Sequence, residues 1–247
     1  MEFREEFLDK LSEAKSIVFF TGAGFSAESG IPTFRGEKGI WNKLKPEELA
    51  SFDAFMRNPN MVWEWYQYRR GIIDDTGPNP GHESIVQLEK YYDTKVVTQN
   101  VDNLHRRAGS KTIFELHGNI ERNYCIDCNY IYNLKDDISI SNKVPRCKKC
   151  GGLVRPDVVW FGEMLPQETF ADAEKAAEEC DICFVAGTSA VVYPAAYIPL
   201  SAKQMGAYVV EINIERTEFS RHADYSIYGK TGEVLPKLVE AVVKLKL

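Results

Sequence analysis

The chain has 247 residues, of which 44% are hydrophobic and 27% charged, and its net charge is −6. These values are typical of a globular protein and exclude wholesale disorder or a fibrous repeat. The acidic balance also argues against a dedicated duplex-binding protein, whose affinity would come from neutralising phosphates. The apolar stretches, such as residues 190–200, are interrupted by prolines and fall short of the ~18 residues of a membrane span. The N-terminal segment is acidic and amphipathic rather than a signal peptide, so we expect a cytoplasmic protein.

Helices and strands are predicted in alternation along the chain. In the first half we expect a helix over residues 3–14, a buried strand over 16–21, mostly helical structure over 45–73 with a break at Asn58-Pro59, a loop over 76–81, a helix over 84–92, and strands over 94–98 and 112–116. In the second half we expect helices over residues 168–180, 198–205 and 233–246 and strands over 181–186 and 207–212. This order predicts an α/β fold, a Rossmann-like parallel sheet with helices on both faces.

Residues 121–155 interrupt this alternation. The segment is polar and rich in cysteine, and we expect it to be an insert that cannot pack a core of its own. The predicted organisation is a single unit over residues 1–247. It comprises a Rossmann-like large domain over about 1–35, 82–120 and 156–247, a helical insert over about 36–81, and a small zinc-binding module over about 121–155.

A glycine-rich turn follows the first predicted strand. The segment Gly22-Ala23-Gly24-Phe25-Ser26-Ala27 matches the G-x-G-x-x-G/A pattern of a dinucleotide loop, in which glycines permit a tight turn and close approach to a pyrophosphate. An ordinary turn is the alternative. The usual acidic residue about 20 positions further on is missing at a strand end, since that region holds Trp41, Glu47 and Glu48 in a helical context. This departure weakens the interpretation as a plain dehydrogenase.

The glycine-rich segment continues to residue 36 as a long loop with one aromatic and one basic side chain. Phe34 is placed to cover a ring and Arg35 to pair with a phosphate, as in a mobile lid over a cofactor. The alternative is an ordinary surface loop.

Polar side chains follow two further predicted strands. Gln99-Asn100-Val101-Asp102 comes after the strand over 94–98, where ligands bind in open α/β sheets. His117 comes after the strand over 112–116 and before Gly118, and an imidazole pKa near ~6.5 suits a general base. A turn of polar residues and a structural histidine are the alternatives.

Four cysteines form the strongest metal signal in the sequence. Two C-x-x-C pairs, Cys125/Cys128 and Cys147/Cys150, are separated by 18 residues. Two such pairs supply the four thiolates of a tetrahedral structural zinc site, so we predict one structural Zn²⁺. Buried free thiols are the alternative. A third pair, Cys180 and Cys183, lies among apolar residues and is predicted to contribute core thiols.

The motifs together resemble the sirtuins, the NAD-dependent protein lysine deacylases. The resemblance rests on GAGFSAESGIPTFRG from Gly22, TQNVDNLH from Thr98, LHGN from Leu116, FGE from Phe161, GTS from Gly187 and NIE from Asn213, which occur in sirtuin order over nearly the whole chain. It implies that His117 is the catalytic base, with Asn100 and Asp102 orienting the ribose and nicotinamide. It further implies an NAD site formed by Gly22, Ala23, Gly24, Ser26, Phe34, Arg35, Trp41, Gln99, Asn100, Asp102, Gly187, Thr188, Ser189, Asn213, Glu215 and Thr231.

The implied reaction transfers an acyl group from lysine to ADP-ribose. The acyl oxygen attacks the nicotinamide ribose, nicotinamide leaves, and deprotonation of the ribose by His117 leads to free lysine and O-acyl-ADP-ribose. Acylated lysine-bearing proteins or peptides are the expected partners. We expect no nucleic acid, no membrane and a monomer.

A second group of residues resembles the class III sirtuins, which remove acidic acyl groups such as succinyl and malonyl. Tyr66 and Arg69 are three residues apart in a predicted helix and so share a face, and with Ala50 they match that branch. Trp160 and residues 190–194 are also similar to it, and Val159, Phe161 and Gly162 are predicted on the substrate side. A surface arginine, a plain deacetylase with little succinyl preference, a zinc-ribbon nucleic-acid or adaptor module, and a dehydrogenase remain as alternatives.

Overall fold

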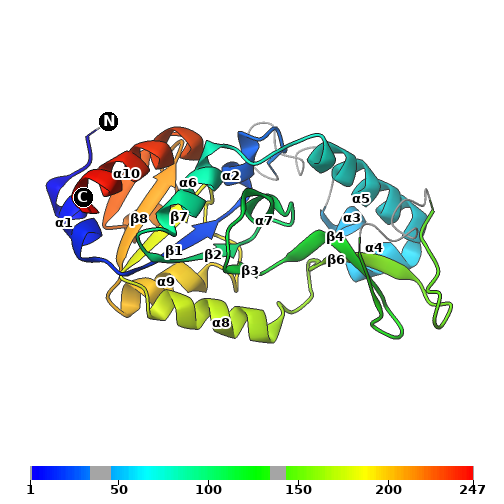
Figure 1. The fold of residues 1–247 in the computed structure, drawn as a ribbon. Helices are drawn as coiled ribbons and strands as arrows, with labels where there is room; N and C mark the ends of the chain where they lie inside the picture. Colours follow the sequence, from blue (N-terminus) through cyan, green and yellow to red (C-terminus); the bar gives the residue numbers. More distant parts are fainter. Residues whose placement is uncertain (1, 34–45, 134–142, 247) are drawn as a thin grey trace.

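The central element is a six-stranded parallel sheet. The structure, a computed structural model, describes residues 2–33, 46–133 and 143–246. The strand order is β3-β2-β1-β7-β8-β9. The strands are β1 (Ser16–Thr21), β2 (Asp93–Thr98), β3 (Ile113–Glu115), β7 (Ile182–Ala186), β8 (Tyr208–Asn213) and β9 (Tyr225–Tyr228). Helices lie on both faces (Figure 1), so the predicted fold class is confirmed.

Each face of the sheet carries its own apolar core because alternate residues of a strand point to opposite faces. Ile17 and Phe19 of β1 belong to a core with α1, α6 and α10, whereas Val18 and Phe20 belong to a core with α8 and α9. These helices are α1 (Glu5–Glu13), α6 (Pro80–Leu88), α8 (Gln167–Glu178), α9 (Tyr197–Gln204) and α10 (Thr231–Lys246). Burial on both faces explains why the central strands are continuous apolar runs.

A second, smaller sheet lies beyond β3 and is antiparallel. Its order is β5-β4-β6, with strands β4 (Gly118–Cys125), β5 (Ile131–Asn133) and β6 (Val154–Val158). Beside it lie three helices, α3 (Pro46–Leu49), α4 (Phe52–Arg57) and α5 (Pro59–Asp74). Asn58 caps α5 by accepting a bond from the Met61 amide, which explains the predicted break at Asn58-Pro59. Three short helices complete the described fold: α2 (Ala23–Ala27), α7 (Leu104–Ala108) and the 3₁₀ helix η3 (Glu218–Arg221).

Two expectations from the sequence are wrong in detail. The loop predicted over residues 76–81 ends early, because α6 begins at Pro80. The Asn79 side chain accepts from the His82 amide while His82 Nδ1 accepts from the Asn79 amide, a reciprocal cap that starts the helix. The cysteine-rich insert does contain a small core, which comprises Cys125, Tyr132, Cys147 and Val154.

No helix in the described part of the chain is both long and apolar enough to cross a membrane.

Candidate functional site

The glycine-rich turn lies at the centre of the carboxyl edge of the large sheet. It joins β1 to α2, and β1 lies between β2 and β7, where the strand order changes direction. This position is the crevice in which doubly wound folds bind their ligands. A Cβ atom on Gly22 would lie 2.6 Å from Thr188 Cβ, and one on Gly24 would lie 2.8 Å from the Gly187 carbonyl oxygen. Close packing against the turn at residues 187–188 is therefore a reason for both glycines, in addition to the predicted approach of a pyrophosphate.

Amide side chains connect the carboxyl ends of β2, β7 and β8. Gln99 follows β2, and its Nε2 donates to the Thr188 hydroxyl after β7 over 2.9 Å. Asn213 ends β8, and its Nδ2 donates to the Thr188 carbonyl over 3.0 Å. Three of the residues predicted for the cofactor are thus held together at one edge, although they come from three separate parts of the sequence.

Asn100 and Asp102 converge on Ser26 of α2. Asn100 Nδ2 donates to the Gly22 carbonyl over 2.9 Å and to Ser26 Oγ over 3.1 Å. Asp102 accepts a bond from the Leu104 amide over 2.9 Å, and it also hydrogen-bonds with Ser26. Burial raises the pKa of the Asp102 carboxyl, while these hydrogen bonds and the charge of Arg69 oppose the rise. The arrangement fixes an amide and a carboxyl beside the glycine-rich turn.

The hydrogen bond of His117 defines which of its nitrogens acts as a base. His117 Nδ1 lies 3.0 Å from the Gln99 carbonyl oxygen. A carbonyl can only accept, so Nδ1 carries the proton and Nε2 holds the lone pair. Burial lowers the pKa of His117, and the bond to Gln99 partly opposes that shift. The imidazole is therefore neutral near pH 7, with Nε2 ready to take a proton.

The predicted acyl-side residues are connected to His117 through the segment that follows β6. The Val159 amide donates to the His117 carbonyl over 2.9 Å, and the Phe161 amide donates to the Ala50 carbonyl over 2.9 Å. Ala50 is buried, whereas the Phe161 ring is 50% exposed and Gly162 is exposed with a φ of +88°. The segment brings the residues predicted for the substrate side next to the residue predicted as the base.

Tyr66 and Arg69 of α5 are both buried. The Arg69 guanidinium carbon lies 5.6 Å from the Tyr66 ring centroid and 5.0 Å from the Trp65 ring centroid. Burial lowers the pKa of Arg69, and a hydrogen bond with Tyr66 and the nearby Asp102 carboxyl oppose that shift. A cation in this position can bind a carboxylate through charge-assisted hydrogen bonds.

Several other predicted cofactor residues lie at the edge of the described site or outside it. Ser189 and Glu215 are exposed, and Ala23 is half-buried. The Thr231 hydroxyl, at the start of α10, donates to Glu28 over 3.0 Å, so this side chain already has a protein partner. Phe34, Arg35 and Trp41 lie outside the residues that the structure describes.

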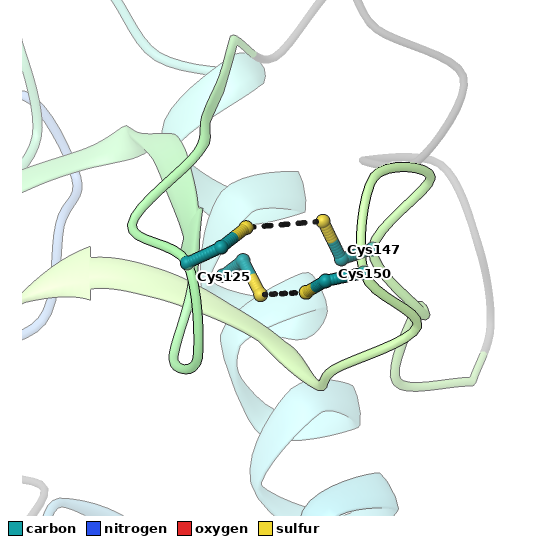
Figure 2. Close-up of side chains that lie close together, drawn as sticks. Cys125, Cys147 and Cys150 are labelled. Carbon is teal, nitrogen blue, oxygen red and sulfur yellow. Dashed lines mark hydrogen bonds between the residues drawn. The ribbon is translucent and has the colours of Figure 1, made fainter.

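The four predicted metal ligands come together between two turns of the small sheet, and Figure 2 labels three of them, Cys125, Cys147 and Cys150. Their sulfur atoms all lie within 4.8 Å of one another. Cys125 Sγ is 3.4 Å from Cys150 Sγ, and Cys128 Sγ is 3.6 Å from Cys147 Sγ. A zinc ion with bonds of about 2.3 Å to four thiolates needs sulfurs separated by nearly 4 Å. The cluster therefore fits one zinc ion, and four thiolates leave no open position for a substrate.

The predicted core role of Cys180 and Cys183 agrees with their burial.

The sequence did not predict the side chains that pack against Tyr66. Trp160 Nε1 donates to the Tyr66 hydroxyl over 2.8 Å, and Arg155 pairs with Glu163 beside Trp160. The segment VVWFGE contains Trp160 and Glu163, but nothing in that pattern indicates a contact with α5. Two other histidines, His82 and His105, are buried, and their ring centroids are 4.7 Å apart.

The known proteins that resemble this chain in sequence and in structure all belong to one family. The sequence model described as "Sir2 family" matches residues 22–194. An NAD-dependent protein deacylase 2 of Pyrobaculum aerophilum is 53% identical over 235 residues, which cover 95% of this chain and 94% of that protein. An NAD-dependent protein deacylase of Pyrococcus furiosus is 52% identical over 240 residues, which cover 95% of this chain and 96% of that protein. A solved Sir2 homolog–NAD complex superimposes with a TM-score of 0.91 and 45% identity, covering 98% of this chain and 95% of that one.

Proposed function

Because the chain belongs to the Sir2 family, we propose that it is an NAD-dependent protein lysine deacylase. The observation that carries the proposal is the hydrogen bond between His117 Nδ1 and the Gln99 carbonyl, which leaves Nε2 as a base at the edge of the sheet where Asn100 and Asp102 also lie. NAD would supply an electrophilic ribose carbon and a nicotinamide leaving group. The products would be nicotinamide, free lysine and O-acyl-ADP-ribose.

The protein's own residues would bind and orient the two substrates. Gly22, Gly24 and the turn at residues 187–189 would hold the phosphates and the adenosine half, together with Asn213. Asn100 and Asp102 would orient the nicotinamide ribose, because both are fixed by hydrogen bonds to the turn after β1 and to Ser26. His117 Nε2 would remove a proton from a ribose hydroxyl, and its Nδ1–H would stay hydrogen-bonded to the Gln99 carbonyl throughout.

The acyl-lysine would lie along the segment over residues 158–163. This segment is bonded to the His117 and Ala50 carbonyls, and Phe161 is exposed beside it. A solved Sir2 structure in complex with a deacetylated p53 peptide and 3′-O-acetyl-ADP-ribose, 36% identical with a TM-score of 0.87 over 96% of this chain and 97% of that one, supports a peptide substrate. Acylated lysines on proteins or peptides are thus the proposed partners.

We propose that the protein prefers lysines that carry an acidic acyl group. Arg69 is 8% exposed and carries the cation that a succinyl or malonyl carboxylate would need. Tyr66 lies beside it and remains protonated near neutral pH, because burial raises the pKa of its phenol. The small side chain of Ala50 would leave room for the longer acyl chain. Acetyl-lysine would still react, since the base, His117, is held by the Gln99 carbonyl and not by Tyr66 or Arg69.

A panel of peptides tests the proposal. Acetyl-, malonyl- and succinyl-lysine versions of one peptide are incubated with NAD and the protein, and nicotinamide and free lysine are measured. The succinyl and malonyl peptides should give the higher kcat/KM. Absorbance at the reduced-nicotinamide band should not appear, whereas a dehydrogenase would generate it. A peptide-dependent reaction with acetyl-lysine alone would reject the acyl preference and leave the deacylase proposal intact.

The division into a large domain, a helical insert over about 36–81 and a zinc module over about 121–155 also stays a proposal, as do the monomeric state and the cytoplasmic location.

A further inference from the structure

The Tyr66 hydroxyl accepts a hydrogen bond from a group that can only donate. Trp160 Nε1 donates to the Tyr66 oxygen over 2.8 Å. An indole nitrogen has no lone pair to offer, and the nearby Arg69 guanidinium, whose carbon lies 5.6 Å from the Tyr66 ring centroid, is also a donor only. The phenol proton is therefore directed away from Trp160.

Trp160 is held at both its backbone and its ring. Arg155 is 1% exposed, and its guanidinium carbon lies 3.3 Å from the Trp160 ring centroid. Its Nη2 donates to Glu163 Oε2 over 2.9 Å, and its Nη1 donates to the other oxygen of the same carboxylate. Glu163 Oε2 in turn accepts from the Trp160 amide over 2.8 Å. We call Arg155, Trp160 and Glu163 the tryptophan clamp.

The clamp restricts where the indole N–H can point. Arg155 Nη2 also donates to the Val158 carbonyl over 2.8 Å, which anchors the guanidinium to the end of β6. Phe55 packs against Trp160, with ring centroids 5.3 Å apart. An indole fixed by a cation, a carboxylate and an aromatic ring cannot rotate away from Tyr66 without breaking several buried contacts.

We propose that Trp160, held by the tryptophan clamp, is a positioning residue that sets acyl preference by directing the Tyr66 proton toward the carboxylate of an acidic acyl group. The inference rests on the proposed preference for succinyl- and malonyl-lysine. It assigns a specificity role to a side chain that does not itself need to touch the substrate. Acetyl-lysine has no carboxylate at that position, so its turnover should not depend on the Trp160–Tyr66 bond.

Trp160→Phe tests the inference, because phenylalanine keeps an aromatic ring and removes the donor. The kcat/KM for succinyl-lysine should fall roughly three- to tenfold, as expected for one neutral hydrogen bond. The loss should appear mainly in KM, and the value for acetyl-lysine should change less than about twofold. Trp63→Phe is the matched control, since it makes the same replacement in α5 at a ring that stacks on Arg70 and lies outside the tryptophan clamp. It should affect both substrates equally.

A double-mutant cycle separates positioning from a general packing effect. In a Tyr66→Phe background, Trp160→Phe should cause no further selective loss with succinyl-lysine, because the hydroxyl it directs is gone. Equal losses for both substrates, or a selective loss that persists in the Tyr66→Phe background, would overturn the inference. If Trp160→Phe does not fold, Glu163→Gln replaces it, with the same selective direction and a smaller effect expected. A wild-type protein inert on succinyl-lysine would instead reject the acyl preference and this inference with it.

Discussion

The two sheets of this protein differ in what holds them together. The six-stranded sheet is covered by helices on both faces, and each face has a core of many apolar side chains. The three-stranded sheet packs against α4 and α5 at one end, through Ile120 and Val158, and at its cysteine end it has a core of four buried residues, of which two, Cys125 and Cys147, belong to the predicted zinc cluster. In the first region the reactive groups lie at the edge of a structure that is stable without them. In the second region the cysteines predicted to bind zinc are themselves part of the core.

This difference predicts opposite consequences for substitutions. A change at His117 or Arg69 should remove chemistry and leave the fold intact. A change at a cysteine ligand should remove structure, because metal binding and local folding are coupled.

Loss of zinc should have the largest effect. Binding free energies in small zinc domains are about 10–16 kcal/mol, so Cys147→Ala or a strong chelator should unfold the small sheet and release the metal. Metal analysis and thermal unfolding give the readout. Cys180→Ala is the matched control, since Cys180 belongs to a C-x-x-C pair buried in the large sheet. A Cys147→Ala protein that keeps zinc and full stability would contradict the claim that the small sheet depends on its metal.

Replacement of the base should have the next largest effect. His117→Ala should lower turnover by ~10² to 10⁴-fold, the usual contribution of a general base, and should leave NAD binding and the melting temperature unchanged. His222→Ala is the matched control, because His222 directly follows η3 and lies in none of the motifs of the site, and this variant should retain normal turnover. Near-normal activity of His117→Ala would remove this residue from the mechanism.

Loss of the buried cation should have a smaller and selective effect. Hydrogen bonds to charged groups contribute about 1.5–3 kcal/mol, so Arg69→Met should reduce kcat/KM for succinyl-lysine by roughly ten- to a hundredfold. The acetyl-lysine value should change little. Arg57→Met removes a charge from the exposed end of α4 and should change neither value. Equal losses for both acyl groups with Arg69→Met would indicate that Arg69 is structural.

The smallest expected effect is the dependence of activity on pH. A general base works only when it is unprotonated, so activity should fall as the pH drops through the pKa of His117. Burial lowers that pKa below its usual 6.5, and kcat/KM should therefore stay level through neutral pH and decline only in more acidic solution. A profile of kcat/KM for acetyl-lysine gives the midpoint. A midpoint above pH 7 would contradict the assigned environment of His117.

The large sheet could be predicted from sequence because its strands are buried on both faces. Residues 16–21 form an apolar run, and β1 has the predicted bounds. The strands of the small sheet were not predicted, since they are polar and are held by cysteines and by partners distant in sequence. Two short elements, α7 and β9, were also missed, because each is only four or five residues long. The start of α6 depends on a side-chain cap rather than on apolar periodicity.

The site was predictable to the extent that its residues occur in local motifs. Gln99, Asn100 and His117 each follow a strand, and the parallel sheet brings those strand ends to one edge. The bond from Trp160 to Tyr66 joins residues that are 94 positions apart. No local pattern contains that contact, so only the folded arrangement reveals that Trp160 supports Tyr66 in the proposed acyl pocket.

The central claim is tested most directly by the stoichiometry of the reaction. The wild-type protein is mixed with NAD and a succinyl-lysine or acetyl-lysine peptide, and nicotinamide and deacylated peptide are quantified over time. The account predicts one nicotinamide for each lysine freed, no nicotinamide without an acylated peptide, and no product when NAD is omitted. Lysine freed without NAD, or NAD consumed with no change in the peptide, would contradict it.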